Sequence, residues 1–295
     1  MNVRFLTLAT PIVAIAELVA CHVLLEGGSN GARCNGPSCS DTGDAGDAST
    51  TEGDAGNDDD ATWKCLGGDR PEPKVAPSIA VRYEHHFVRV LDRKPWERLE
   101  LRACDSFDEY CVQPLAGSAT TTDTLGLAVV PLYRGFRGYL DISEPSSDGG
   151  LLPSLVVVGP VVDRDGPIPR VALYSAEDFR YALAALHAVA VYVDGSAPSG
   201  HLLFKALDCL RQPAADVVVR VNTLTADTFQ YYTDADGVPS IAVEATTSAG
   251  TGGVLRLPIG RATLSMTKHD GTLIVETEVP IRAGTMTYVT LGPTP

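Results

Sequence analysis

The sequence predicts an all-β protein made of two tandem antiparallel β-sandwich domains of transthyretin-like or immunoglobulin-like type, with one short helix between them. Three observations predict it. Gly (28) and Pro (20) are abundant, aromatic residues make up only 6% of the 295 residues, and short β-branched runs alternate with turn residues. The hydrophobic fraction of 44% suffices for a real core. Long helical bundles are therefore disfavoured.

Residues 1–20 are expected to be an export signal. Arg4 precedes an apolar run, Phe5 to Ala16, that is shorter than the roughly 20 residues of a membrane span. The segment Leu18-Val19-Ala20-Cys21 resembles the lipobox of bacterial lipoproteins. That resemblance implies that the Cys21 thiol is acylated and that an N-terminal lipid holds the protein to a membrane.

Two alternatives to the lipobox remain open. Cleavage after Ala14-Ile15-Ala16 would release a soluble protein. An uncleaved anchor would instead extend the apolar run through Val23-Leu24-Leu25, and it would place Glu17 and His22 in hydrocarbon at a cost of several kcal/mol.

Residues 21–62 are expected to form a disordered acidic linker. The segment from Ser40 to Thr62 holds eight acidic residues and no basic ones, so it carries −8 of the net charge of −14. Low hydrophobicity with one sign of charge predicts an extended, self-repelling spacer. A calcium site in the Asp run is less favoured because nothing fixes the ligands. The acidic balance also argues against nucleic acid as a partner.

The first sandwich domain is placed at 63–147 and should begin near Trp63. Strand-like segments punctuated by Gly, Pro and polar residues follow at 79–91, 99–103, 116–122, 126–132 and 138–143. A connector at 148–196 contains a helix over 176–186. Its capping box is Ser175 with Asp178, and Phe179, Ala182, Leu183 and Leu186 lie on one face that should pack at the junction.

The second sandwich domain is placed at 197–295. The β-branched run Val217–Val221 is predicted to be a central strand. Asp270-Gly271 separates two alternating segments and predicts a tight hairpin turn. Met286 to Leu291 is expected to be the last strand.

The two domains share a faint repeat of turn, strand, Pro-marked turn and strand. Its clearest pieces are Thr122-Asp123…Gly126 in the first domain and Pro258…Gly260 in the second, where Thr246-Thr247…Gly250 lacks the Asp. This layout resembles that of bacterial lipoproteins with carboxypeptidase regulatory-like (transthyretin-like) β-sandwich domains. The resemblance implies a fold and export. It implies no catalysis, because the peptidase chemistry of such proteins lies in another domain.

Seven cysteines suit an oxidising compartment. If Cys21 is acylated, six remain, and fifteen connectivities are possible. Proximity in sequence favours Cys34 with Cys39 and Cys104 with Cys111, which leaves Cys65 with Cys209. Zinc is disfavoured because the chain has no C-x₂-C pair.

The sequence predicts no catalytic residue, no metal site and no cofactor. It contains neither an H-E-x-x-H nor a G-x-S-x-G motif. His85 and His86 are adjacent, so on a strand their side chains should point to opposite faces. The glycines at 250–253 lack the Lys of a phosphate loop, and Asp234–Gly237 fits a tight turn better than a calcium loop.

Two aromatic clusters are candidates for stacking on a ligand, with burial in the core as the competing interpretation. They are Tyr133, Phe136 and Tyr139, and Phe229, Tyr231 and Tyr232. The expected function is therefore that of an exported, lipid-anchored, non-catalytic protein of the cell envelope, at the outer membrane or cell surface. It would have a surface, adhesion or binding role, with protein or glycan as partner. A divergent envelope hydrolase or peptidase and a structural spacer or assembly subunit are the alternatives.

Overall fold

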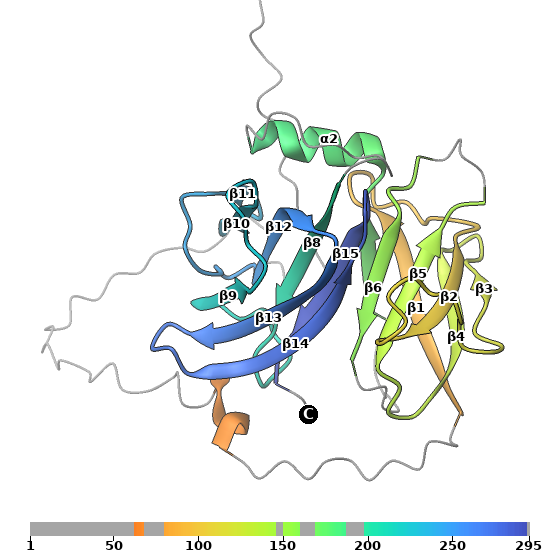
Figure 1. The fold of residues 1–295 in the computed structure, drawn as a ribbon, viewed down its shortest axis with the longest axis horizontal. Helices are drawn as coiled ribbons and strands as arrows, with labels where there is room; N and C mark the ends of the chain where they lie inside the picture. The colour runs from red at the N-terminus through yellow and green to blue at the C-terminus, as the bar shows by residue number, and fades with distance from the viewer. Residues whose placement is uncertain (1–61, 68–79, 146–149, 160–168, 187–197, 294–295) are drawn as a thin grey trace, which may run out of the picture.

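The structure, a computed structural model, describes residues 62–67, 80–145, 150–159, 169–186 and 198–293. Within these ranges the chain forms strands β1 to β15, a 3-10 helix η1 (Lys64–Gly67) and one α-helix, α2 (Ala176–Ala185) (Figure 1). The all-β prediction is confirmed. The predicted signal with Cys21, and the linker with Cys34 and Cys39, lie outside the described residues, apart from Thr62.

We call the first sandwich module 1. Its sheets are β4-β1-β7 and β3-β2-β5-β6, and side chains from both meet in one core. The strands are β1 (Ala80–Arg89), β2 (Glu100–Asp105), β3 (Thr120–Thr121), β4 (Leu127–Tyr133), β5 (Gly138–Ser143), β6 (Ser154–Val158) and β7 (Arg170–Leu173).

We call the second sandwich module 2. The strands β11-β10-β12-β8-β15 and the sheet β14-β13-β9 enclose a second core. Its strands are β8 (Ser199–Ala206), β9 (Val217–Val221), β10 (Phe229–Thr233), β11 (Pro239–Ser240), β12 (Thr251–Pro258), β13 (Gly260–Lys268), β14 (Leu273–Ile281) and β15 (Met286–Leu291).

The modules repeat one topology. Strand β1 pairs antiparallel with β4 and parallel with β7, and β8 pairs in the same way with β12 and β15. The Thr122 hydroxyl accepts a bond from the Leu99 N–H (2.9 Å) and donates to the Trp96 carbonyl (2.7 Å). Thr246 does the same with Val217 (3.1 Å) and Ala214 (2.7 Å). The repeat suggested by Thr122 and Thr246 in the sequence is therefore a repeat of structure.

One sheet runs through both modules. Strand β15 of module 2 pairs in parallel with β6 of module 1, from Met286↔Ser154 to Tyr288↔Val156, which joins nine strands (Figure 1). The purely antiparallel arrangement expected from the sequence is therefore incomplete, because β1–β7, β6–β15 and β8–β15 are parallel pairs. Parallel pairing is possible because the two partners of each pair are far apart in the chain and are not joined by a hairpin.

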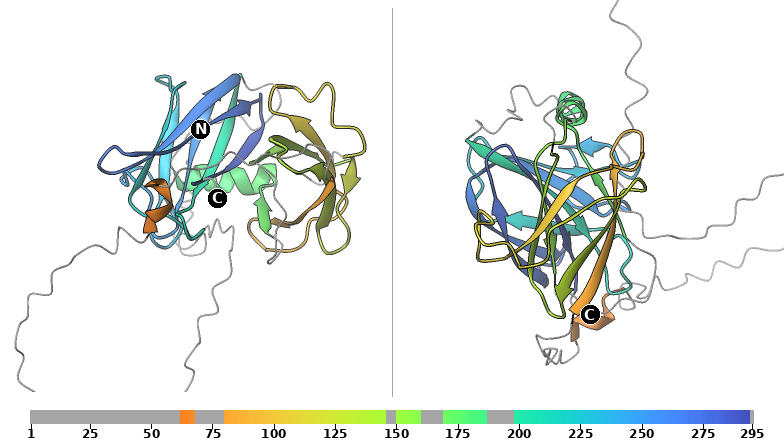
Figure 2. Two further views of the ribbon diagram at one scale, coloured as in Figure 1. Left: turned by 90° about the horizontal axis from the view of Figure 1, so that it is seen from below. Right: turned by 90° about the vertical axis from the view of Figure 1, so that its right-hand side faces the viewer.

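The segment placed as a connector at 148–196 contributes two strands to module 1, β6 and β7. Both strands are short, so neither shows enough alternation of polar and apolar residues to be recognised in the sequence. The helix is confirmed, and the Ser175 hydroxyl caps it by accepting the Asp178 N–H (2.9 Å). Figure 2 shows α2 lying across one end of the strands. Its four predicted face residues are buried in the junction.

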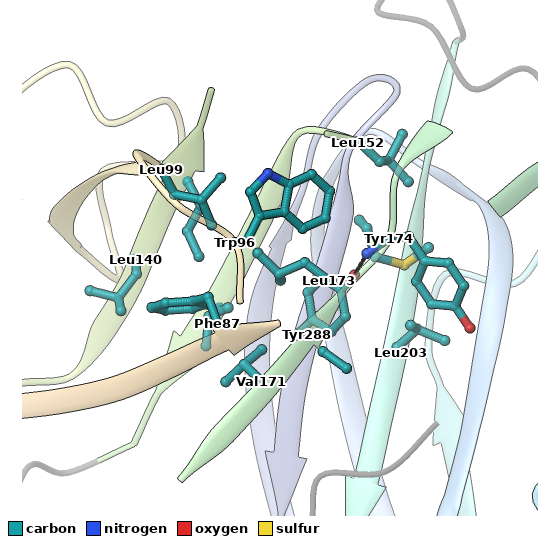
Figure 3. Close-up of a cluster of buried hydrophobic side chains, with 14 of the residues drawn as sticks. Phe87, Trp96, Leu99, Leu140, Leu152, Val171, Leu173, Tyr174, Leu203 and Tyr288 are labelled. Atoms are coloured by element: carbon teal, nitrogen blue, oxygen red, sulfur yellow. Dashed lines mark hydrogen bonds between the residues drawn. The ribbon is translucent and has the colours of Figure 1, made fainter. Parts of the chain in front are cut away.

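The core of module 1 continues into module 2. Leu203, Met286 and Tyr288 of module 2 belong to the same cluster of buried side chains as residues of module 1 and α2. Figure 3 shows Leu203 and Tyr288 near Leu173 and Tyr174. The Tyr174 N–H donates to the Tyr288 hydroxyl at 3.1 Å, and burial raises the pKa of that phenol far above its usual value. The modules therefore share apolar packing as well as a sheet, so they form one folded body.

Candidate functional site

The aromatic clusters singled out in the sequence belong to the core. Phe136, Tyr139, Tyr231 and Tyr232 are buried, and Tyr133 and Phe229 are half-buried against the junction core. The four buried rings have no accessible face on which a ligand could stack, so for them the assignment as stacking residues is wrong. For the half-buried Tyr133 and Phe229 it stays a prediction. A chain with few aromatic residues uses them to fill its interior.

Tyr232 shows why a polar ring is needed inside module 2. Its hydroxyl accepts the Val219 N–H at 3.0 Å, and the Gln230 amide donates to the Val219 carbonyl at 2.7 Å. These bonds satisfy backbone groups on the outer side of β9, an edge strand. Side chains that cap an edge in this way prevent it from pairing with another chain.

The exposed aromatic rings lie in a loop that the sequence analysis did not select. In the described part of the chain, Phe107 (84% exposed) and Tyr110 (59%) are the large aromatic side chains that face solvent, and Val112 (76%) lies beside them in sequence. All three belong to residues 105–113, which we call the display loop. Apolar residues without strand or helix periodicity, placed around two paired cysteines, were the signal that could have found it.

The display loop is fixed by local bonds. Cys104 and Cys111 form a disulfide, as predicted, with Cα atoms 5.3 Å apart. The Asp108 carboxylate accepts the N–H groups of Val112 (2.9 Å) and Gln113 (2.7 Å). Asp105 accepts the Phe107 N–H (2.9 Å). The backbone of the loop is therefore ordered by groups that lie within it.

Two arginines of module 2 form hydrogen bonds to the backbone of the same loop. Arg261 donates to the Ser106 carbonyl (2.6 Å), and Arg282 donates to the Glu109 carbonyl (2.7 Å). Arg282 also lies 3.3 Å from the Asp141 carboxylate and contacts the Tyr139 hydroxyl. Carbonyl groups of a loop from module 1 are thus bound by cations of module 2, which gives strong, charge-assisted hydrogen bonds.

The region around the disulfide does not offer a metal site. Cys104, Cys111 and Asp141 have ligand atoms within 4.8 Å of one another. Both sulfurs are used in the disulfide, so no thiolate is available to a metal. The Asp141 carboxylate already pairs with Arg102 at 2.8 Å and with Arg282.

A cavity of about 510 Å³ lies at the turn between β1 and β2. Charged side chains line it with both signs, among them Arg89, Asp92, Lys94 and Glu144. It is lined by no His, Ser or Cys side chain, and its Asp92 carboxylate pairs with the Lys94 ammonium at 3.0 Å.

The described histidines are dispersed. His85 is buried between the rings of Tyr83 and Phe87, whereas His86 turns toward the Leu125 carbonyl. The predicted opposite faces are therefore observed. His201 is buried against Phe179 of α2. Among the residues described, no helix is long and apolar enough to cross a bilayer.

No family model and no curated protein matches the chain. Similar solved structures include the Bacillus anthracis TIE protein (14% identity, 73% of this chain and 34% of that one, TM-score 0.23). Others are the shaft pilin SpaA from Lactobacillus rhamnosus GG (12%, 73% and 100%, TM-score 0.23) and a streptococcal ancillary pilin (14%, 74% and 63%, TM-score 0.24). The chain spans about a third of the length of the TIE protein chain.

The bonds to Asp108 predict how the display loop responds to acid. The Gln113 N–H, followed by the Val112 N–H and the Arg282 charge, lowers the pKa of Asp108 below its ordinary 3.8. A carboxylate with a lowered pKa stabilises the folded loop above pH 3.8, and this contribution is lost as pH falls through the lowered value. Amide NMR shifts of Val112 and Gln113 should titrate with a midpoint below 3.8. A midpoint at or above 3.8, or an unchanged titration in Asp108→Asn, would contradict this assignment.

Proposed function

We propose that the protein is an exported, lipid-anchored, non-catalytic component of the cell envelope that binds a partner protein through the display loop. One observation carries the proposal. Phe107, Tyr110 and Val112 face solvent on a backbone that a disulfide, two Asp side chains and two arginines hold in place. The resemblance of the segment ending at Cys21 to a lipobox supports the anchor.

An ordered backbone lowers the cost of binding. An interface usually loses affinity when it must order loops and side chains, and this loop is ordered beforehand. Exposed Phe and Tyr rings are also typical anchors, because each contributes a large apolar area with few rotatable bonds. The Arg261 guanidinium lies 5.7 Å from the Phe107 ring centre, but the ring is still 84% exposed. Apolar side chains that stay exposed on a fixed loop bury little area in the fold, so a partner surface explains them best.

The chemistry of the loop favours a protein over a glycan. The carboxylates of Asp105 and Asp108 already accept N–H groups of the loop itself. A sugar would therefore find few fixed polar groups for its hydroxyls, whereas two rings and an aliphatic side chain suit an apolar protein surface. The remaining Glu109 carboxylate and the acidic character of the loop favour a partner with basic residues at the rim of its contact.

Photo-crosslinking in cells that produce this protein tests the proposal. A photoreactive residue at position 107 or 110 should give a discrete crosslinked protein. The same residue at Leu273, which is 55% exposed on the β13–β14 hairpin, should not. Equal adducts at the loop and at Leu273, or none at the loop, would overturn the loop as the binding site.

The variant Phe107→Ala should separate binding from folding. Truncating a central aromatic anchor typically costs about 2 kcal/mol or more of binding energy, so the yield of the crosslink at position 110 should fall by roughly tenfold or more. The exposed ring contributes to stability mainly through its contact with the Arg261 guanidinium, so the free energy of unfolding should change by no more than about 1 kcal/mol. Unchanged crosslinking in this folded variant would contradict the proposed anchor.

A further inference from the structure

The first described residues of the chain, 62–67, are attached to module 2, although module 1 follows them in sequence. Trp63 is only 8% exposed and packs in the core of module 2, with Leu66 against the same core. The Cys209 N–H donates to the Thr62 carbonyl at 3.2 Å. Cys65 forms a disulfide with Cys209, the pair that remained by elimination in the sequence, at a sequence separation of 144.

This attachment skips a module. Strand β1 of module 1 begins at Ala80, whereas Cys209 follows β8, the first strand of module 2. We propose that the Cys65–Cys209 disulfide makes module 2 the attachment point of the N-terminal segment, so that tension on this segment bypasses residues 66–208 and leaves module 1 unloaded. The physiological meaning of that tension rests on the proposed lipid anchor, but the attachment itself does not.

Three sets of contacts connect module 1 to module 2. They are the β6–β15 pairing, the shared core that contains Tyr288, and the bonds from Arg261 and Arg282 to the display loop. All three lie between the modules. Their module 2 partners, which are β15, Arg261 and Arg282, belong to the segment after Cys209 that carries the tension. A pull on the N-terminus therefore reaches module 1 only through its contacts with module 2, and the display loop keeps its local structure until module 2 yields.

The disulfide also closes a very long loop, and this explains why a bond at this place is effective. In the chain-entropy account, a disulfide at a sequence separation of 144 lowers the entropy of the unfolded chain more than the Cys104–Cys111 disulfide, whose separation is 7. Trp63 adds a buried aromatic contact beside it. Covalent and apolar contacts therefore fix the same short segment to the same module.

Single-molecule stretching of the purified full chain, held at its two ends, tests the bypass. With the disulfide intact, only the part of the fold after Cys209 can lengthen, by about 300 Å at roughly 3.5 Å per residue. In the double variant Cys65→Ala, Cys209→Ala, or in wild type with dithiothreitol, unfolding should add about 800 Å. The reduced wild type keeps the test valid if the double variant folds poorly.

The matched control is Cys104→Ala with Cys111→Ala. Its cysteines lie within the bypassed segment, so the added length should remain about 300 Å. An added length of about 800 Å for oxidised wild type, or of about 300 Å after reduction, would overturn the bypass. These lengths do not depend on the display loop or on lipidation, so the proposed function could fail while the bypass holds, and the reverse.

Discussion

Replacing Gly126 by Ala is expected to destabilise the protein by about 3–5 kcal/mol, a large effect for one methyl group. Gly126 has a φ of +72°, and a Cβ built there would lie 2.3 Å from the Phe87 carbonyl oxygen, which belongs to the backbone of β1. The new methyl group therefore meets two penalties, the left-handed conformation and an overlap with main-chain atoms that cannot rotate away.

The same position matters for the hydrogen bonds of the module. The Phe87 N–H donates to the Gly126 carbonyl at 2.8 Å, and the Trp96 N–H donates to the Phe87 carbonyl at 2.9 Å. Displacing the turn would lengthen both bonds. In module 2, Gly250 takes the same role with Ala206, where an added Cβ would approach the carbonyl oxygen to 2.8 Å. Gly250→Ala should therefore destabilise the protein, but less than Gly126→Ala does.

Chemical denaturation measures these changes, and Gly117→Ala is the control. Gly117 also has a positive φ, +77°, but its Cβ would meet nothing within 4 Å. It should lose only the conformational term of about 1 kcal/mol. If Gly126→Ala were no more destabilising than Gly117→Ala, the close approach of the turn to β1 would not be a determinant of stability.

This repeat shows what the sequence could reveal. The turn after Thr122 closes through a local bond from the Gly126 N–H to the Asp123 carbonyl (3.0 Å). The turn after Thr246 closes from the Gly250 N–H to the Thr247 carbonyl (2.8 Å), so the spacing from Thr to Gly is preserved in the sequence. The hairpin at Asp270-Gly271 and the capping box at Ser175 are local in the same way. Turns and caps depend on a few neighbouring residues, and for this reason they are readable without any knowledge of the tertiary structure.

The features that the sequence did not reveal depend on distant partners. The pairing of β15 with β6 joins segments that are far apart in the chain. The side-chain pattern of each strand does not indicate which strand it pairs with. Burial of Tyr139 likewise depends on Arg282, which is 143 residues away. The residue type alone does not tell whether an aromatic ring is exposed in a loop or buried in a strand. For this reason the sequence analysis selected rings of the core and missed those of the display loop.

The variant Trp96→Ala is expected to lose about 3–5 kcal/mol of stability, typical of removing a large aromatic side chain from a core. The Trp96 side chain is 1% exposed and is among the largest fully buried side chains described. The guanidinium of Arg89 lies 5.0 Å from its ring centre. The equivalent residue in module 2 is Ala214, which makes the same backbone bond to Ala206, so the backbone itself tolerates Ala. The predicted loss therefore comes from the cavity.

Trp96→Ala also tests whether the modules unfold together. The chain has two tryptophans, so the variant leaves Trp63, in the core of module 2, as the one remaining indole emitter. Because the junction core and the nine-stranded sheet join the modules, the denaturation midpoint from Trp63 fluorescence should fall together with that from circular dichroism. If the Trp63 transition stayed at its wild-type midpoint while part of the circular dichroism signal was lost earlier, module 2 would be folding independently, and the junction would be a contact between two separate cores.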